Sequence, residues 1–383
     1  MARTDQALSL DDFEALAQRH LPRPVFEYIR GGVETNASVD DNRQAFQDFA
    51  FIPRALVDVS TIDTSLSLFG NPYRSPVGIA PMGLSALSAY RGDIVQAQAA
   101  SAAGIPMIMS GSSLIRMEEV AAVAPATWFQ AYLPGNTQEI EKLVARVAHA
   151  GFGTLVITVD TPVAANRENN IRAGFSTPLR PSLRLLFDGI THPRWVCSTF
   201  LKTCLKHGMP HFENNYATRG APILSKNVLR DYSDRGHISW DHLRAIRARW
   251  QGRLVIKGIL NAEDAHTAIS NGVDGLIVSN HGGRQLDGSI APLRVLPEIV
   301  DIAGNVPVML DSGVRRGTDV IKALALGAKC VFVGRPFNYA AAVGGRMGLD
   351  RAIQLITAEI SRDLGLLGVQ HIGALSQDHI RKK

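Results

Sequence analysis

The amino-acid sequence predicts a single (β/α)8 barrel with an N-terminal helical extension and a long insertion after the fourth strand. Three observations lead to this fold class. Eight short apolar runs of strand length alternate with helix-like runs along the chain. Six of the seven intervals between the starts of these runs measure 20 to 33 residues, the length of one strand–loop–helix unit. Each run also leads into a polar, charged, glycine or proline residue, and barrel enzymes keep their functional residues at those strand ends.

Each predicted strand is a run of the kind that a buried parallel strand requires. In chain order the strands are Val77–Ala80, Met107–Met109, Thr127–Tyr132, Thr154–Val159, Leu254–Lys257, Gly275–Ser279, Val308–Asp311 and Val331–Val333. The helices predicted between them include Asp93–Ala103, Glu139–Ala150, Ala262–Asn271 and Thr318–Leu326. An open, doubly wound sheet is the competing fold, but its glycine-rich G-x-G-x-x-G turn follows none of these strands.

Two segments extend the predicted barrel. The starts of the fourth and fifth strands lie 100 residues apart, so we expect an insertion there, at about residues 174–240. Near the N-terminus, Ser9 and Asp12 have the spacing of a helix start, with apolar residues on one face of the helix that follows. We expect residues 1–383 to form one domain that carries both segments.

The composition, with 46% hydrophobic and 20% charged residues, is that of a globular protein and argues against several functional classes. The net charge of +5 comes without a basic stripe interleaved with aromatic residues, which argues against nucleic-acid binding. Three sparse cysteines argue against a disulfide framework or a metal site and favour a reducing compartment, the cytoplasm. The acidic N-terminus is not typical of a signal peptide, and no apolar run approaches the roughly 18 residues of a membrane span.

Residues 279–288, Ser-Asn-His-Gly-Gly-Arg-Gln-Leu-Asp-Gly, contain the strongest chemical signal. His281 can accept a proton, and Arg284, three residues later, can hold a carboxylate. The two glycines between them, Gly282 and Gly283, let the backbone turn sharply near a ligand. A tight turn with a solvated histidine and arginine is the alternative. The pair predicts chemistry on a small organic acid.

The loops after the last two strands have the pattern of a phosphate site. Barrels often bind phosphate there through backbone N–H groups and a helix N-terminus. The loops supply Gly313 and Gly334 for close approach, and Arg315 and Arg335 for charge. Two turns with surface arginines are the alternative, but the pattern occurs in both loops in the expected order, which favours phosphate.

Two further charged residues end the fifth and fourth strands. Lys257 follows three apolar residues and would point into the barrel mouth, where a cation stabilises an electron-rich ring; a surface lysine is the alternative. Asp160 would orient the imidazole of His281 and stabilise its protonated form, as carboxylates do in catalytic triads. On the sequence alone, an aspartate that caps the turn before Pro162 is an equally good interpretation.

These segments resemble the FMN-dependent α-hydroxy acid dehydrogenase and oxidase family from about Leu21 to Leu364, and residues 279–287 are the most specific match. The other matching segments are residues 80–83, 129–132, 158–162 with Arg167-Glu168, 256–258, 311–313 and 334–335. The resemblance implies an FMN cofactor across the barrel mouth. The residues that it implies for FMN binding are Ala80, Pro81, Ser110, Gln130, Thr158, Lys257, Ser279, Asp311, Gly313, Arg315, Gly334 and Arg335.

The resemblance also implies roles around the substrate. The substrate-binding residues that it implies are Tyr28, Tyr132, Arg167 and Arg284, with the carboxylate between the two arginines. Tyr132 would contact the substrate hydroxyl, and His281 would act as the base, paired with Asp160. Whether the proton leaves from carbon or from oxygen, by carbanion or hydride transfer, stays open.

Two positions differ from the plant glycolate oxidase pattern of the family. Gly83 stands where such oxidases have alanine, as in members that are dehydrogenases. Ser112 stands where they have a pocket tryptophan, which leaves room for a substrate side chain larger than that of glycolate, such as a phenyl ring. These positions favour a dehydrogenase for a mandelate-like or lactate-like substrate.

The insertion mixes basic and apolar residues. The basic residues between Arg172 and Tyr216 are Arg172, Arg180, Arg184, Arg194, Lys202 and Lys206, against two acidic residues. The apolar ones include Phe187, Trp195, Phe200, Leu201 and Leu205. This mixture suits a segment on an anionic membrane surface, and a basic lid over the active site is the alternative. Residues 191–195 and 207–210 resemble the membrane-associated bacterial mandelate dehydrogenases of the family.

We therefore expect an FMN-dependent (S)-2-hydroxy acid dehydrogenase that forms a 2-oxo acid and passes electrons to a quinone or another respiratory-chain acceptor. We expect it to be peripheral on the inner face of the cell membrane, and the resemblance alone implies a homotetramer. A soluble oxidase of the same family, which uses oxygen and makes hydrogen peroxide, is one alternative. A barrel that binds a phosphorylated ligand without redox chemistry is another.

Overall fold

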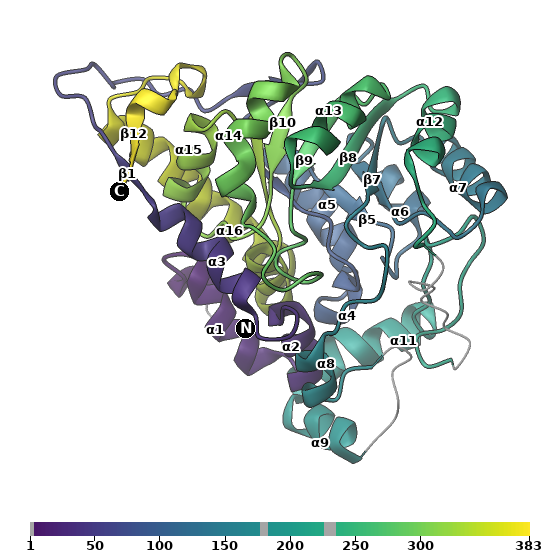
Figure 1. Cartoon of the computed structure of the whole chain (residues 1–383). Coiled ribbons are helices and arrows are strands. Elements are labelled where there is room, and N and C mark those ends of the chain that lie inside the picture. The colour runs from purple at the N-terminus through teal and green to yellow at the C-terminus, as the bar shows by residue number, and fades with distance from the viewer. Residues whose placement is uncertain (1–3, 177–182, 226–234) are drawn as a thin grey trace.

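Eight parallel strands form the centre of the molecule (Figure 1). The computed structural model describes residues 4–176, 183–225 and 235–383. The strands are β4 (Val77–Ile79), β5 (Ile108–Ser110), β6 (Trp128–Ala131), β7 (Thr154–Thr158), β8 (Arg253–Ile259), β9 (Gly275–Val278), β10 (Val308–Leu310) and β11 (Cys330–Val333). They pair in the order β4-β11-β10-β9-β8-β7-β6-β5, and a parallel bridge between Ile79 and Met107 joins the two ends. The predicted (β/α)8 barrel is confirmed, and the strand limits differ from the predicted ones by at most two residues.

Helices cover the outside of the barrel between successive strands. They are α4 (Ser85–Ser88), α5 (Gly92–Ala103), α6 (Met117–Val123), α7 (Thr137–His149), α12 (Trp240–Arg249), α13 (Ala262–Ser270), α14 (Pro292–Ala303), α15 (Gly317–Ala325) and α16 (Arg335–Leu367). The four helices that the periodicity predicts are all present. In α7 the buried residues recur every three to four positions, at Ile140, Leu143, Val144 and Val147, so one stripe of this helix packs against the barrel.

The interior of the barrel is filled with side chains and is closed at one end by a small hairpin. The hairpin strands β2 (Leu66–Leu68) and β3 (Asn71–Tyr73) pair in antiparallel fashion. Their apolar side chains pack against one layer of inward-facing residues, which includes Ile108, Trp128, Val156, Val255, Ile277, Met309 and Phe332. Because this end is plugged, the opposite end, where the strands terminate at their carboxyl ends, is the one that can open to ligands.

The N-terminal extension packs beside the open end of the barrel. It consists of η1 (Thr4–Gln6), α1 (Leu10–His20), α2 (Arg23–Arg30) and α3 (Ala37–Gln47). The predicted start of α1 is confirmed, since the backbone N–H of Ser9 donates to the Asp12 carboxylate at 2.9 Å. Helix α1 packs along α16. Strand β1 (Phe49–Phe51) pairs with the C-terminal strand β12 (Ile380–Lys382). Two 3-10 helices, η3 (Ile372–Ala374) and η4 (Gln377–His379), precede β12 in the chain.

The segment between β7 and α12 contains α8 (Glu168–Ala173), α9 (Leu183–Thr191), α10 (Pro193–Trp195), the π-helix η2 (Val196–Leu201) and α11 (Lys202–His207). Helices α8 and α9 contact α2, as Figure 1 shows at its lower edge. The Trp195 indole is buried and donates to the Leu87 carbonyl at 2.7 Å, so Trp195 joins the segment to the barrel and is not part of an exposed apolar surface as its sequence context suggests. Among the basic residues predicted to give this segment its charge, Arg180 lies outside the described residues.

Candidate active site

His281 and Asp160 form a buried pair, although 121 residues separate them. The Nδ1 atom of His281 lies 2.8 Å from the Asp160 carboxylate, and the two residues come from the loops after β9 and β7. His281 has a left-handed backbone with φ of 59°, which is uncommon outside glycine. Backbone strain of this kind is stored mainly at functional sites, and here it turns the imidazole toward the aspartate.

The protonation of this pair follows from burial and charge. Burial lowers the pKa of His281 below its usual value, although the Asp160 carboxylate beside it acts in the opposite direction. Burial alone would raise the pKa of Asp160, but the charge and hydrogen bond of His281 hold it below the ordinary value. At neutral pH the aspartate is therefore ionised and the imidazole neutral, with Nδ1–H donating to the carboxylate. The lone pair on Nε2 is left to accept a proton, and Tyr132 Oη lies 3.3 Å from it.

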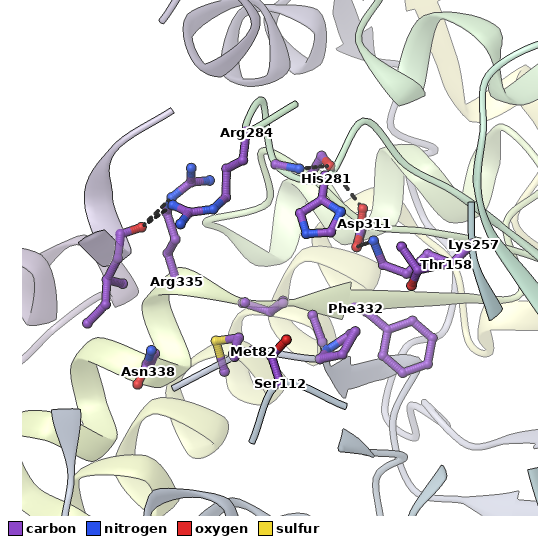
Figure 2. A pocket seen from close by; sticks show the side chains of 18 of the residues that line it. Met82, Ser112, Thr158, Lys257, His281, Arg284, Asp311, Phe332, Arg335 and Asn338 are labelled. Carbon is purple, nitrogen blue, oxygen red and sulfur yellow. Dashed lines mark hydrogen bonds and ion pairs between the residues drawn. The ribbon is translucent and has the colours of Figure 1, made fainter. Parts of the chain in front are cut away.

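Three arginines gather on one side of His281. Arg284 donates to the carbonyls of Ile29 and Gly31, and its guanidinium lies 5.1 Å from the centre of the Tyr28 ring. Arg167 donates to the Arg284 carbonyl at 3.2 Å and to the side chain of Gln285. Figure 2 shows the guanidinium groups of Arg284 and Arg335 next to each other, with the imidazole beyond them.

Burial and mutual repulsion suit this group of arginines to binding an anion. Burial, with the charges of Arg167 and Arg335 nearby, lowers the pKa of Arg284 to about 9. Burial likewise lowers the pKa of Arg335 to about 10. Both side chains stay protonated at neutral pH, and each has exchanged its hydration for neutral carbonyls. A bound carboxylate or phosphate would relieve this repulsion.

Lys257 lies on the other side of His281 (Figure 2). Lys257 is only 3% exposed, and its side chain forms an ion pair with Asp311 at 3.0 Å. Its Nζ also donates to Ser279 Oγ at 2.8 Å, and the same oxygen accepts the backbone N–H of His281. The prediction that Lys257 points to the barrel mouth and not to the surface agrees with this burial.

The loops after β10 and β11 face one another at the far end of the site. Gly313 has φ of 85°, and a Cβ atom there would lie 2.2 Å from the Asn42 carbonyl oxygen, so only glycine fits. Gly334 is the N-cap of α16, and no side chain accepts a hydrogen bond at that cap. The first backbone N–H groups of α16, whose initial helical part ends at the kink at Gly345, are therefore available to a ligand beside the buried side chain of Arg315.

One cavity joins these groups. The predicted residues that line it are Tyr28, Ala80, Pro81, Tyr132, Thr158, Arg167, Lys257, His281, Arg284, Asp311, Gly313, Arg315, Gly334 and Arg335. Four predicted residues do not line it. Asp160 lies behind His281, Ser279 lies behind Lys257, and Ser110 donates to the side chain of Gln130 at 3.2 Å one layer below.

Several buried polar atoms at the site suit the FMN that the sequence predicts. Among the described residues, Gln130 Nε2 and Thr158 Oγ1 are buried without a hydrogen-bond partner. Arg315 Nε is also buried without one and faces the Asp11 carboxylate only at 3.7 Å. Buried polar groups are rarely left unsatisfied, so these atoms indicate a ligand with polar groups along its length. A flavin ring with a phosphate tail has such groups at both ends.

Sequence reasoning missed four polar or sulfur-bearing residues that line the cavity, which are Met82, Thr161, Ser312 and Asn338. Ser312, with φ of 81°, accepts the backbone N–H of Gly282 and donates to Asp311, which ties the histidine loop to the β10 loop. Asn338 lines the cavity three residues after Arg335, a spacing that places both on one face of α16. Met82 lines it directly after Pro81. The helical spacing would have identified Asn338, but nothing in the sequence distinguishes Ser312.

Comparison with known proteins agrees with this geometry. Residues 17–382 match the family model of FMN-dependent dehydrogenases. The chain is 37% identical to an (S)-mandelate dehydrogenase of Pseudomonas putida, over 98% of this chain and 94% of that protein. It is 39% identical to an L-lactate dehydrogenase of Xanthomonas campestris pv. campestris, over 97% of this chain and 96% of that protein.

The fold comparison gives the same result. An (S)-mandelate dehydrogenase described as a monotopic membrane protein superimposes with a TM-score of 0.89 at 35% identity, covering 99% of this chain and all of the other. On family match, identity over nearly the whole length and shared fold, the chain belongs to the FMN-dependent dehydrogenase family, as an FMN-dependent 2-hydroxy acid dehydrogenase.

Proposed function

We propose that this protein oxidises an (S)-2-hydroxy acid to the 2-oxo acid, with His281 as the base. The observation that supports this most directly is the pairing of a neutral, buried imidazole with an ionised carboxylate, within one cavity that also contains Arg167 and Arg284. A base beside two carboxylate-binding cations is what a 2-hydroxy acid requires, because its reacting carbon is bonded directly to its carboxylate.

Each side chain has a defined task in this proposal. Arg284 and Arg167 bind the substrate carboxylate and fix the position of the neighbouring carbon. Tyr132 donates to the substrate hydroxyl oxygen, and His281 Nε2 takes the proton. Asp160 then stabilises the imidazolium that forms, because its carboxylate is already hydrogen-bonded to Nδ1.

The cofactor residues follow the same logic. FMN, when bound, accepts the two electrons of the oxidation. Lys257, held by Asp311 and Ser279, supplies positive charge to the ring. Gln130 and Thr158 would take hydrogen bonds with its polar edge. The residues at the phosphate end would be Gly313, Arg315, Gly334 and Arg335, and Ala80 and Pro81 would contact the ring. Ser110 would act through Gln130, to whose side chain it donates.

The proposed substrate has a side chain larger than a methyl group. Ser112 is buried in the wall of the cavity, and a Cβ atom at Gly83 would lie 3.1 Å from Ser112 Cβ. Neither position therefore carries a large side chain into this part of the cavity, which Tyr28 also lines. A phenyl group such as that of mandelate would occupy the space.

Anaerobic mixing of the yellow holoenzyme with a panel of acids tests this function. The panel contains lactate, glycolate, 2-hydroxyoctanoate and both enantiomers of mandelate, and the measurement is loss of flavin absorbance. We expect rapid bleaching by (S)-mandelate and none by (R)-mandelate. Oxygen uptake at the rate measured with a dye acceptor would identify an oxidase instead. A purified protein that stays colourless with added FMN would support the non-redox barrel.

We also propose that the insertion binds the inner face of the cell membrane. Phe187, Ile190, Leu201 and Leu205 are each at least 45% exposed, and Leu205 reaches 86%. The exposed basic residues near them in the chain include Arg194, Lys202 and Lys206. Apolar side chains mixed with lysine and arginine suit insertion into an anionic bilayer surface. No helix among the described residues is long and apolar enough to cross a bilayer.

Flotation with vesicles tests the membrane proposal. Vesicles with and without anionic phosphatidylglycerol are mixed with wild type and with the double variant Leu201→Ser, Leu205→Ser. We expect wild type to float with anionic vesicles and the variant to remain behind, with activity toward dye retained. Leu366→Ser, which changes a leucine on α16 whose exposure lies between those of Leu201 and Leu205, is the matched control. Equal flotation of all three proteins would refute the proposal.

The electron acceptor and the assembly complete the proposal. At a membrane surface, a quinone is the acceptor that an electron-donating flavoprotein meets. Reduction of a soluble quinone analogue by the substrate-reduced enzyme, at a rate matching turnover, is the expected result. A homotetramer is expected from the family resemblance, and light scattering on the detergent-free protein measures it directly.

A further inference from the structure

Besides the neutral imidazole of His281, Tyr132 has a charged neighbour. The guanidinium carbon of Arg235 lies 5.1 Å from the centre of the Tyr132 ring, within the range of a cation–π contact. Arg235 stands five residues before α12, in the return from the insertion to the barrel. Arg235 plays no part in the binding and proton-transfer roles assigned above.

Arg235 lies in the wall of the site. Its Nε and Nη1 atoms are buried. It lines a smaller cavity together with Thr158 and Thr161, and these two threonines also line the main cavity. Leu133, the residue after Tyr132, lines the smaller cavity as well. The Tyr132 ring therefore has a fixed positive charge at its π-system and the base His281 at its hydroxyl.

We propose that Arg235 is a positioning residue that holds Tyr132 and strengthens its hydroxyl as a hydrogen-bond donor during turnover. This inference rests on the role proposed above for Tyr132. A cation over the ring draws electron density from the phenol, so Oη–H becomes a better donor as negative charge grows on the substrate oxygen. The contact also restricts rotation of the ring, which keeps Oη near His281 Nε2.

The interaction gains most strength in the transition state, because only there does the substrate oxygen gain charge. It therefore affects kcat more than KM. A purely structural role would be served by any side chain of the same size, whereas this role requires a positive charge. Methionine keeps much of the apolar volume of arginine, and lysine keeps the charge.

The experiment is a double-mutant cycle on the FMN-loaded enzyme, with kcat and KM for (S)-mandelate measured for each protein. The variants are Arg235→Met, Arg235→Lys, Tyr132→Phe and the Tyr132→Phe, Arg235→Met pair. Arg244→Met, on α12 with its guanidinium on Asp241 and Asn271, is the matched control. Flavin absorbance per protein verifies that all are loaded equally.

We expect Arg235→Met to lower kcat about 3- to 20-fold with KM nearly unchanged. Arg235→Lys should recover most of the loss, and Arg244→Met should lose nothing. In the Tyr132→Phe background, Arg235→Met should have almost no further effect, since the hydroxyl it acts through is gone.

Two results overturn the inference about Arg235 alone. In the first, Arg235→Met lowers kcat by the same factor in the wild-type background and in the Tyr132→Phe background. In the second, the kcat of Arg235→Lys is as low as that of Arg235→Met. If Tyr132→Phe itself leaves turnover unchanged, the role proposed for Tyr132 fails, and the inference about Arg235 fails with it.

Discussion

Arg284 and Arg335 donate hydrogen bonds to the same two backbone carbonyls, those of Ile29 and Gly31. Arg284 Nη1 lies 3.2 Å from the Ile29 oxygen and 2.6 Å from the Gly31 oxygen, and Arg335 reaches them at 3.0 and 3.1 Å. These carbonyls end helix α2, where the helix dipole is negative. The C-terminal end of α2 thus holds two arginines side by side, one from the loop after β9 and one from the loop after β11. Because their partners are neutral carbonyls, the positive charge of both arginines can still attract an anion.

The pKa of about 9 at Arg284 predicts an alkaline limit to substrate binding. Above that pH the free enzyme loses the guanidinium charge, so KM for the hydroxy acid should rise while kcat changes less. A bound carboxylate raises the pKa of the guanidinium, which moves the corresponding limb of kcat to higher pH. The measurement is KM between pH 7 and pH 10.5. A KM that stays flat across this range would contradict the assignment.

Replacing the base should separate turnover from flavin binding. His281→Gln should lower kcat by at least about 100-fold, because a positioned base contributes that much or more. The protein should remain yellow, since His281 is not among the groups proposed to hold the phosphate. Stopped-flow flavin reduction and the flavin-to-protein absorbance ratio give the two results. Wild-type turnover in this variant would disprove the mechanism.

Asp160 should control both the rate and its pH profile. Burial lowers the pKa of His281, so kcat/KM should fall on the acid side only below about pH 6.5, when the imidazole protonates. Asp160 raises that pKa, so Asp160→Asn should move the acid limb to still lower pH. It should also lower the plateau by about 100- to 10,000-fold, because the imidazolium loses its partner. A slower variant whose acid limb moves upward would argue against the pairing.

Ser112 should set the size of the substrate. Ser112→Trp would place a large ring in the cavity beside Gly83, so kcat/KM for (S)-mandelate should fall about 10-fold or more relative to lactate. Ser112→Ala leaves the space open and serves as the control. Equal losses for both substrates in the tryptophan variant would mean that the space does not receive the side chain.

Asp93 should reduce stability as the pH rises. Burial raises its pKa to about 7, and among the described residues its Oδ2 atom has no hydrogen-bond partner. Its folded pKa exceeds the unfolded one, so its contribution is most favourable below about pH 4 and is lost as pH rises through about 7. The total change is on the order of 4 kcal/mol. Asp93→Asn should therefore unfold at higher denaturant concentration than wild type at pH 8, with a smaller difference at pH 5.

The barrel was predictable from the sequence because each of its units is defined locally. The run at Gly275–Val278 is apolar throughout, as a strand buried on both faces requires, and Ala262–Ser270 has the periodicity of a helix. The chemistry of His281 and Arg284 was also predictable, because both residues lie in one loop and their types and spacing can be read directly from the sequence. Strand limits moved by a few residues because hydrogen-bond pairing, and not hydrophobicity, decides where a strand ends.

Contacts between distant segments were decided by the tertiary structure alone. The sequence left Asp160 equally open to a turn cap or a partner of His281, and only the adjacency of the β7 and β9 loops brings the two side chains to 2.8 Å. The same holds for Arg335 on the end of α2, for Trp195 buried against Leu87 and for Arg235 over Tyr132. A residue's type determines which bond it can form, but its partner depends on how the whole barrel closes.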